Sequence, residues 1–376
     1  MSRRRFFAGA AAAGVAAAAA ACRPRLRSDE ATTEGSRNLS ALRWPAEWER
    51  HEATLMAMPF RPALYGRRLD DCRREWAVVA QAIARFEPVK MVVPPGTERQ
   101  MCELLGPRID LMPLRYDDGW IRDSGPIFLS DRSTLTGLDW GFNGWGGAWD
   151  RYRSNWSADD ALPVAVCRQL GIPSRTIPMV LEGGSVQCDG RGTVITTEEC
   201  LLNPNRNPTM TKGEIEDALK SNFSARKVIW LPYGLLGDLT SGHVDGTCVF
   251  IGPGRVLAQA DSADPEGLRR LEANLVVLRS ATDAEGRPLE VAEFPFLPRA
   301  HFAGGPLTSH SYINFGFADG GVVVPLSGLD REDAQALEGL RDLFPDREVA
   351  GVPTPTMTWA GGGVHCVTQQ VPAPAT

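Results

Sequence analysis

The sequence lacks a long hydrophobic run, a paired-cysteine motif and an excess of basic residues, and each absence excludes a class of protein. Its 40 Lys and Arg residues are outnumbered by 46 Asp and Glu residues, which leaves a net charge of −6. A mildly acidic chain without a stripe of basic and aromatic residues binds nucleic acid poorly, so no nucleic-acid partner is expected. None of the eight cysteines forms a C-x-x-C pair, which argues against a zinc knuckle or a thioredoxin-like site. No G-x-G-x-x-G motif follows a predicted strand, and no cofactor is expected.

The N-terminus is predicted to be an export signal and not part of the fold. Arg3, Arg4 and Arg5 precede two phenylalanines and an Ala/Gly run from Ala8 to Ala21. This run is shorter than the roughly 20 apolar residues that span a bilayer. The pattern is typical of a twin-arginine signal over residues 1–21, which predicts a periplasmic or other extracytoplasmic location. Cys22 follows three alanines, so acylation and a membrane tether through Cys22 stay open as alternatives.

Both ends of the mature chain are predicted to be disordered. Residues 22–40 are polar without an apolar period, which favours a disordered tether, and residues 373–376 form a low-complexity tail. Most cysteines lie in apolar surroundings and are predicted to be buried thiols, since their spacing does not indicate a disulfide framework.

Between these ends, short β-branched or aromatic runs alternate with helical patterns, which predicts an α/β fold. The composition, with 38 Gly and 28 Pro, favours a loop-rich globular protein. The predicted strands are Val89–Val93, Ile127–Leu129, Thr193–Thr197, Cys248–Ile251, Tyr312–Phe317 and Val322–Pro325. The predicted helices are Asp71–Phe86, Lys212–Asn222, Pro265–Leu278 and Arg331–Leu343.

Two acidic motifs are candidates for a binding site. Residues 117–126 read DDGWIRDSGP, in which three carboxylates and an arginine surround Trp120. Apolar residues among the charges indicate a partly buried site, with a solvated acidic turn as the alternative. Residues 181–185 read LEGGS, and Glu182 is either a site residue or an exposed residue of a simple turn.

Three further motifs carry polar or reactive side chains among glycines. In residues 240–246, TSGHVDG, an extended chain would direct His243 and Asp245 to one face, whereas the alternative is a surface pair. In residues 361–366, GGGVHC, three glycines allow close approach to the backbone, and Cys366 is either a nucleophile or an ordinary core residue. In an extended chain His365 would face away from Cys366. Residues 200–207, CLLNPNRN, are predicted to form a structural polar turn.

Together these residues favour chemistry on a cation. A cysteine nucleophile needs a partner that transfers protons, which His243 can supply. Several carboxylates suit a guanidinium, which presents five donors in a planar fork. A thiolate can then attack the guanidinium carbon without a metal.

The motifs, in this order, resemble the agmatine deiminase and bacterial peptidylarginine deiminase family of the guanidine-modifying superfamily. Further matching segments are WPAEWE from Trp44, HEAT from His51, GFNGWGG from Gly141 and VTQQ from Val367. The resemblance covers roughly residues 44–372 and implies one deiminase catalytic domain over residues 41–372. It also implies a fivefold pseudosymmetric α/β propeller of ββαβ-type units with a central site.

The resemblance also implies the site roles. Cys366 would attack the guanidinium carbon, and His243 would act first as general acid and then as general base. Asp123 and Asp245 would hold the guanidinium nitrogens, and Glu182 would orient or stabilise His243. Other predicted substrate contacts are Asp118, Trp120 and Gly363. The thiolate could arise from a lowered cysteine pKa or from the charge of the bound substrate.

The implied reaction is hydrolysis of agmatine to N-carbamoylputrescine and ammonia, a step of putrescine synthesis for which export is an unusual setting. The family commonly reads Met-Ala-Trp-Pro and then Arg-Pro-Asp-Asn where this chain reads MAMPFRPALY over residues 56–65. Arg151 and Arg153 could bind a carboxylate or could be solvated, so free arginine and peptidyl-arginine stay open as substrates.

Three other classes of function stay open. An amidinotransferase would resolve the intermediate with an amine, and a non-catalytic guanidine-binding protein would not need the thiol. A metal hydrolase is disfavoured because no His/Asp cluster has ligand spacing along the chain. The predicted partner is a small guanidinium compound, and a homo-oligomer is possible.

Overall fold

The computed structural model describes residues 42–131, 133–147 and 155–374. The predicted export signal, the tether with Cys22, and the arginines Arg151 and Arg153 lie outside these residues. Within these ranges, no helix combines the length and apolar character that a bilayer crossing requires.

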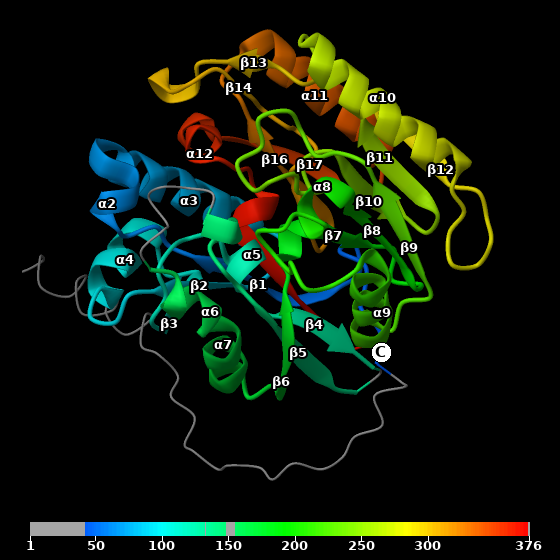
Figure 1. The fold of residues 1–376 in the computed structure, drawn as a ribbon. Coiled ribbons are helices and arrows are strands. Elements are labelled where there is room, and N and C mark those ends of the chain that lie inside the picture. Colours follow the sequence, from blue (N-terminus) through cyan, green and yellow to red (C-terminus); the bar gives the residue numbers. More distant parts are fainter. Residues whose placement is uncertain (1–41, 132, 148–154, 375–376) are drawn as a thin grey trace, which may run out of the picture.

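The α/β prediction is confirmed, and the strands fall into small separate sheets (Figure 1). Over the described ranges, five sheets contain three or four strands and a sixth contains two. The first is β18 (Thr368–Pro372), β1 (His51–Ala57), β2 (Val89–Val93) and β3 (Ile109–Pro113). The next two are β4 (Ile127–Ser130), β5 (Leu135–Gly141) and β6 (Ser174–Val180), then β7 (Val186–Cys188), β8 (Thr193–Thr197) and β9 (Lys227–Leu231). The others are β10 (Cys248–Gly252), β11 (Arg255–Gln259) and β12 (Glu290–Phe294); β15 (Gly316–Ala318), β16 (Gly321–Leu326) and β17 (Glu348–Pro353); and β13 (Arg299–Ala300) with β14 (Thr308–Ser309).

The five larger sheets share one pattern of pairing. Each contains an antiparallel pair followed by a parallel pair, as in β4–β5 and β5–β6. Parallel neighbours need a crossover connection, and helices supply it in every case. Those between parallel strands are α2 (Pro62–Tyr65), α3 (Leu69–Ile83), α4 (Glu98–Leu105), α6 (Ser157–Asp160), α7 (Leu162–Leu170), α8 (Glu198–Leu201), α9 (Lys212–Phe223), α10 (Pro265–Ser280) and α11 (Asp330–Leu343). Among the residues that the structure describes, the remaining α-helices are α5 (Ile121–Ser124) and α12 (Pro355–Ala360).

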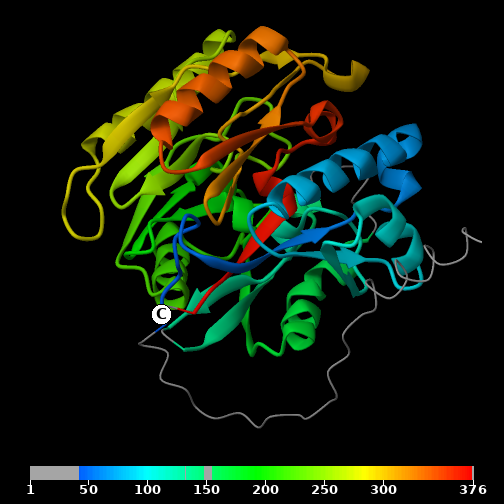
Figure 2. The ribbon, with the colours of Figure 1, turned by 180° about the vertical axis from the view of Figure 1, so that it is seen from behind.

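The two ends of the described chain meet in the first sheet. Strand β18 pairs antiparallel with β1, from His51 opposite Pro372 to Met56 opposite Thr368. Figures 1 and 2 show these blue and red strands side by side near the middle of the molecule. The GGGVHC motif of residues 361–366, here called the C-terminal motif, directly precedes β18 and is therefore held close to the first strand.

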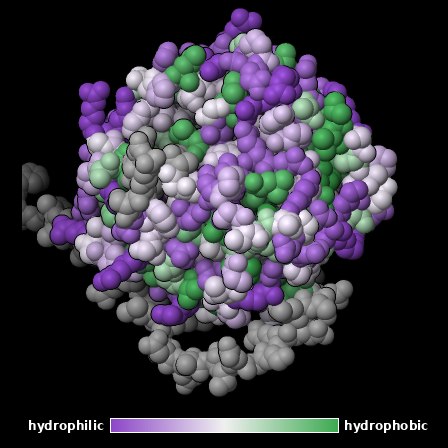
Figure 3. Space-filling view, viewed as in Figure 1, coloured by the Kyte–Doolittle hydropathy of each residue, from purple (hydrophilic) through white to green (hydrophobic). Residues whose placement is uncertain are grey.

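The hydrophobic core is divided in the same way as the sheets. Buried residues form five clusters over the described ranges, each associated with different strands and helices. Helix α3 illustrates how the sequence encodes one of them, because Trp76, Val79 and Ile83 lie on one helix face and are buried. Figure 3 shows hydrophilic residues over most of one outer face, with hydrophobic residues in small groups between them.

Most predicted elements are confirmed to within a few residues. Strands Val89–Val93 and Thr193–Thr197 match, and the four predicted helices are found as α3, α9, α10 and α11. Helix α9 begins at the predicted residue because Thr211 and Glu214 form a capping box. Helix α3 ends before Phe86, in a turn that leads to Pro88.

The predicted strand Tyr312–Phe317 is wrong. Only its last two residues enter β15, and the preceding residues form a turn in which the Asn314 amide donates to the Ser311 carbonyl at 3.2 Å. The aromatic side chains are buried in a core cluster, which explains the strand-like pattern. The turn directs Asn314 toward the C-terminal motif, where the His365 amide donates to its carbonyl at 3.0 Å.

Candidate active site

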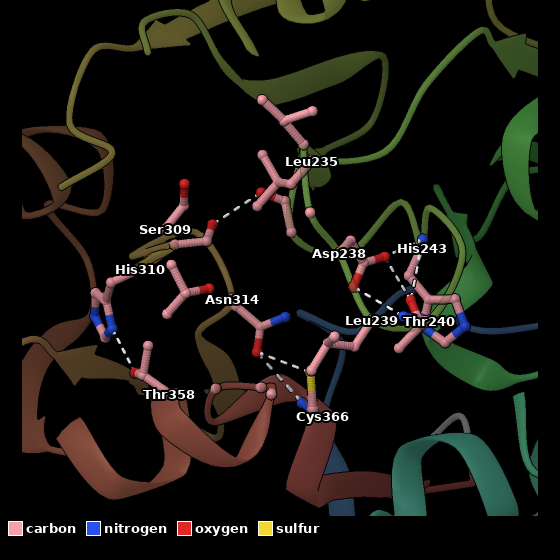
Figure 4. A pocket seen from close by; sticks show the side chains of 18 of the residues that line it. Leu235, Asp238, Leu239, Thr240, His243, Ser309, His310, Asn314, Thr358 and Cys366 are labelled. Atoms are coloured by element: carbon pink, nitrogen blue, oxygen red, sulfur yellow. Dashed lines mark hydrogen bonds between the residues drawn. The ribbon is translucent and has the colours of Figure 1, made fainter. Parts of the chain in front are cut away.

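A cavity of about 260 Å³ lies where the C-terminal motif meets the loop before β10. It is lined by His243, Asp245, Gly363 and Cys366. Figure 4 shows His243 and Cys366 among the lining side chains. Leu239 and Leu307 also line it and are 45% and 48% exposed, so they mark its open side. A polar interior with a partly apolar opening suits a small ligand with a polar group at one end.

Cys366 lies in a 3₁₀ turn, η7 (His365–Val367), and not in an extended segment. Its Sγ is 3.4 Å from Asp245 Oδ2 and 3.3 Å from Asn314 Oδ1, and Figure 4 shows the contact with Asn314. Burial, followed by the charges of Asp245 and Asp123, raises the pKa of the Cys366 thiol well above its ordinary value. The thiol is therefore protonated in the unliganded protein.

The glycines before Cys366 make room for neighbouring groups. A Cβ at Gly362 would lie 2.6 Å from the Trp120 ring and 2.9 Å from the Cys366 Cβ. Any other residue at this position would push the nucleophile candidate or the indole aside.

The loop that carries His243 and Asp245 is bent and not extended, so the conditional strand interpretation of this motif is wrong. Asp238 Oδ2 accepts from the amides of Gly242 at 2.9 Å and His243 at 2.8 Å. Ser241 and Gly242 adopt positive φ values of 68° and 100°, which turn the chain. The bend nevertheless directs both His243 and Asp245 into the cavity.

Gly184 identifies the point on which the charged side chains converge. A Cβ there would lie 2.7 Å from His243 Nδ1, 2.8 Å from Asp123 Oδ1 and 3.0 Å from Asp245 Oδ2. The Glu-Gly-Gly motif, far from the other motifs in the sequence, thus contributes a residue without a side chain at the centre of the site.

His243 is buried between two carboxylates. Its Nδ1 lies 3.7 Å from Asp123 Oδ1, and its Nε2 lies 3.8 Å from Glu182 Oε2. Burial lowers the pKa of His243, but Asp123, Cys200 and Glu182 more than offset this and hold the pKa well above its ordinary value. His243 is therefore an imidazolium and can donate a proton.

Asp123 and Glu182 do not line the cavity, but each lies within 4 Å of a ring nitrogen of His243. Asp123, in α5, accepts from the Gly184 amide at 2.9 Å and from Trp145 Nε1 at 2.9 Å. Burial raises the pKa of Asp123, and the nearby Asp245 charge adds to this. Two lone pairs of Asp123 stay available for a cationic ligand.

Glu182 is ionised and held by an arginine. Its Oε1 accepts from Arg206 Nε at 2.7 Å, and both side chains are fully buried. Burial raises the pKa of Glu182, but the charges of Arg206 and His243 more than offset this and lower it below the ordinary value. Arg206 belongs to the polar turn predicted over residues 200–207, so that turn supports the site.

The predicted contacts Asp118 and Trp120 lie outside the cavity. Asp118 is buried and accepts from the Tyr65 hydroxyl at 2.6 Å, and burial raises its pKa to about 7. Tyr65 comes from the segment that departs from the family pattern. The Trp120 ring borders Gly362, whereas Gly363 lines the cavity as predicted.

One group of potential metal ligands escaped the sequence analysis because its members are far apart along the chain. Ligand atoms of Glu182, Cys200 and His243 lie within 4.8 Å of one another. Spacing along the chain was therefore an incomplete argument against a metal. The Arg206 guanidinium occupies one oxygen of Glu182, which makes this an unfavourable place for a cation, and we do not assign it as a metal site.

Sequence reasoning also missed four residues that support the site. Asn314 contacts Cys366. In the sequence it lies within the aromatic run Tyr312–Phe317, which was interpreted as a strand. Trp145 bonds Asp123, and its segment had been noted without a role. Of the other two, His365 contacts Asp245, and Glu47 contacts His365.

The arrangement combines a thiol, a proton donor and carboxylates around one cavity. Six of the described cysteines are free thiols, and Cys366 is the one of these six that is not fully buried. These groups can bind a planar cation, attack it and protonate a leaving group.

The sequence profile of the Porphyromonas-type peptidyl-arginine deiminases matches residues 43–372. The chain belongs to this family. An agmatine deiminase of Stutzerimonas stutzeri is 40% identical over 357 residues, covering 88% of this chain and 95% of that protein. One from Pseudomonas aeruginosa is also 40% identical, over 359 residues, covering 88% of this chain and 96% of the relative.

The family also accounts for the fold. The solved agmatine deiminase of Enterococcus faecalis superposes with a TM-score of 0.86 at 32% identity, covering 92% of this chain and all of that one. The family prediction made from the motifs is thus confirmed.

Proposed function

We propose that this chain hydrolyses agmatine to N-carbamoylputrescine and ammonia through a covalent intermediate on Cys366. The observation that carries the proposal is the convergence of Asp123, His243 and Asp245 beside Gly184, with the Cys366 thiol 3.4 Å from Asp245. The similarity to proteins named agmatine deiminase over most of the chain supports the choice of substrate.

The guanidinium group of the substrate enters the cavity and meets Asp245, which lines it. One edge of the group reaches past the lining to Asp123, which is recessed beside His243. Each carboxylate can accept from two adjacent N–H groups of the planar cation. The guanidinium carbon then faces Cys366, because Asp245 contacts the sulfur and holds the substrate nitrogens at the same time. Positioning of this kind supplies much of the rate enhancement.

The bound substrate supplies the charge that activates the thiol. In the unliganded site, burial and two carboxylates keep Cys366 protonated. A guanidinium between those carboxylates neutralises them, the pKa of the thiol falls, and the thiol releases its proton to solvent. Of the two origins of the thiolate that the sequence left open, the raised pKa of Cys366 favours the substrate.

The reaction then proceeds in two balanced steps. The thiolate forms a bond to the guanidinium carbon, and the adduct breaks its bond to one nitrogen, which leaves as ammonia after taking a proton from His243. An amidino-thioether remains on Cys366. His243, now neutral, takes one proton from water as the oxygen attacks the same carbon. The carbon–sulfur bond then breaks, the hydroxyl proton of the adduct passes to the departing sulfur, and the neutral ureido product leaves.

Glu182 holds His243 for both proton transfers. Its negative charge stabilises the imidazolium, and Arg206 fixes the carboxylate. The distance of 3.8 Å between Glu182 Oε2 and His243 Nε2 leaves the ring some freedom to meet different partners.

The test is to measure ammonia and ureido product with agmatine, free arginine and an arginine-containing peptide in parallel. We expect turnover of agmatine and no turnover by Cys366→Ala, which should still bind agmatine in a calorimeter. Turnover by Cys366→Ala would overturn the nucleophile assignment. Ureido product from agmatine without the matching ammonia, or ammonia released only with an added amine, would contradict simple hydrolysis.

A second candidate is deimination of free arginine or peptidyl-arginine. It is favoured by the family profile, whose description names peptidyl-arginine. The same cavity residues would perform the same two steps and yield citrulline. Preference for arginine or the peptide over agmatine in the parallel assay would select this candidate, and Arg151 and Arg153 would then be tested as contacts for its carboxylate.

We also propose that the five larger sheets surround a common axis as the blades of a fivefold pseudosymmetric propeller. The shared pairing pattern and the closure of β1 against β18 support this arrangement. An experimental structure in which the five sheets do not surround one axis would contradict it.

For the N-terminus, we propose export by the twin-arginine route, with acylation of Cys22 as an open addition. The support is the sequence pattern of residues 1–21. Replacement of Arg3 and Arg4 by lysine should retain the chain in the cytoplasm, as judged by cell fractionation. Export of this double variant at the normal level would exclude the route.

A further inference from the structure

A second histidine, His365, contacts Asp245 and does not line the cavity. It is 1% exposed. Its Nδ1 is 2.8 Å from Asp245 Oδ2, and its Nε2 is 3.0 Å and 3.1 Å from the two oxygens of Glu47. The ring therefore bridges two buried carboxylates.

This geometry fits a ring with a hydrogen on both nitrogens, because the lowered pKa values of Glu47 and Asp245 keep both carboxyl groups ionised. A neutral imidazole would direct a lone pair at one of the carboxylates, which repels it at hydrogen-bonding distance. Gln187 Nε2 also lies 3.3 Å from His365 Nε2, and rotation of its amide exchanges nitrogen for oxygen at this position. The shorter contacts to Glu47 identify His365 as an imidazolium.

An arginine completes the set. Arg122 donates from one terminal nitrogen to Glu47 at 3.0 Å and from Nε to the His365 carbonyl at 3.2 Å. Two carboxylates and two cations therefore balance in a buried group. Burial raises the pKa of Glu47, but Arg122 and His365 reverse this and lower it to about 2.

The consequence falls on Asp245. Burial and the nearby Asp123 both disfavour its charge, since two buried carboxylates that share a site rarely ionise together. His365 opposes this, because its hydrogen bond and charge bring the pKa of Asp245 below the ordinary value despite burial. The same Oδ2 atom contacts both His365 and the Cys366 sulfur.

We propose that His365 is a positioning residue that, as an imidazolium held by Glu47, orients Asp245 and keeps it ionised to receive the guanidinium. His365 also helps to place Cys366, because the two residues are neighbours in one turn and both contact Asp245 Oδ2. His365 acts through Asp245 and does not touch the substrate.

The kinetic test, which rests on the proposed deiminase reaction, compares His365→Gln with wild type. The groups that face His365 are Glu47, Arg122, Asp245 and Gln187. Loss of the imidazolium raises the pKa of Asp245, so the acid limb of kcat/KM should move to higher pH. We expect the acid limb to move up by about one pH unit or more, so that kcat/KM falls about tenfold at pH values below this limb and much less near neutral pH.

Tyr312→Phe is the matched control for a structural effect. It removes a buried hydrogen bond to a carboxylate, 2.7 Å from Asp333, outside the candidate site. It should lower the melting temperature without moving the pH profile. An unchanged profile in His365→Gln, with the same loss of stability as this control, would overturn the positioning role.

The second measurement does not depend on turnover. The chain has five histidines, so nitrogen NMR of labelled imidazoles can be assigned by substitution. At about pH 7.5, above the ordinary histidine pKa of about 6.5, both His365 nitrogens should be protonated, and Glu47→Gln should abolish this. His310 is the internal reference for a neutral ring, because burial lowers its pKa to about 4. A neutral His365 in wild type would overturn the proposal even if agmatine is turned over, whereas an imidazolium without turnover would count against the function alone.

Discussion

The charges of two histidines act on the active-site carboxylate Asp245, and each histidine belongs to a set of histidine, glutamate and arginine. The two sets are built alike, since in each a buried arginine bonds a glutamate that faces the histidine. They differ in how closely the histidine is held. The sets are Glu182, Arg206 and His243 on one side and Glu47, Arg122 and His365 on the other.

The distances separate the two histidines by function. His365 meets its carboxylates at 2.8–3.1 Å, whereas His243 lies 3.7 Å and 3.8 Å from its partners. His243 Nε2 is buried without a hydrogen-bond partner. His243 lines the cavity and can exchange a proton with a substrate, while His365 has both nitrogens engaged and can only hold its neighbours. The same chemical set thus yields a mobile proton in one case and a fixed charge in the other.

The largest effect is expected from removing the proton donor His243. His243→Asn should lower kcat for the best substrate by about 10²–10⁴-fold, because general acid and base catalysis is lost. His365→Asn should lower kcat less, since its amide can still donate to Asp245. Steady-state kinetics of both variants check this ordering, and equal losses would remove the distinction between the two histidines.

A smaller effect tests the likeness of the two arginines. Arg206→Met and Arg122→Met each leave a buried glutamate without its partner, which should lower the free energy of unfolding by about 3–5 kcal/mol. Denaturant unfolding measures it. Arg99→Met, which removes an exposed pair with Glu103, is the control and should cause no measurable change. A loss in only one of the two buried variants would show that the sets are not equivalent.

The smallest effect concerns how Glu47, in the set with His365, contributes to stability in acid. The pKa of Glu47 is about 2 in the folded protein against an ordinary 4.5, a difference that corresponds to about 3 kcal/mol. A carboxyl whose folded pKa is depressed stabilises the fold above its unfolded pKa. That contribution is lost as pH falls from about 4.5 towards 2. Unfolding at several pH values should therefore show the gap between wild type and Glu47→Gln narrowing in this window, and a constant gap would refute the assignment.

Local structure was predictable where the pattern and the environment agree. The helix that begins at Lys212 has its cap in the adjacent residues, and Val89–Val93 is a buried apolar run, so neighbours along the chain were enough. Tyr312–Phe317 failed because its aromatic residues are buried for packing in a turn. The side chain that this turn presents, Asn314, was consequently missed.

The sequence predicted which residues form the candidate site, but it did not predict their protonation states. Motifs identified Cys366 and His243 through resemblance, and these residues do meet at one cavity. Asp118 and Asp123 stand in the same acidic motif and neither lines that cavity, but Asp123 contacts His243 whereas Asp118 accepts from Tyr65. Nothing in the local sequence distinguishes Asp118 from Asp123, because the difference lies in which way a short turn directs each carboxylate.

The sequence by itself determined the α/β character of this protein, its family and the reactive residue types. Only the tertiary structure decided which groups carry charge. His365 and Glu47 are 318 positions apart, and their contact inside the protein makes one an imidazolium and the other a carboxylate. Protonation depends on the charges and the desolvation around a group, and for buried residues both are set by segments that the chain brings together only when it folds.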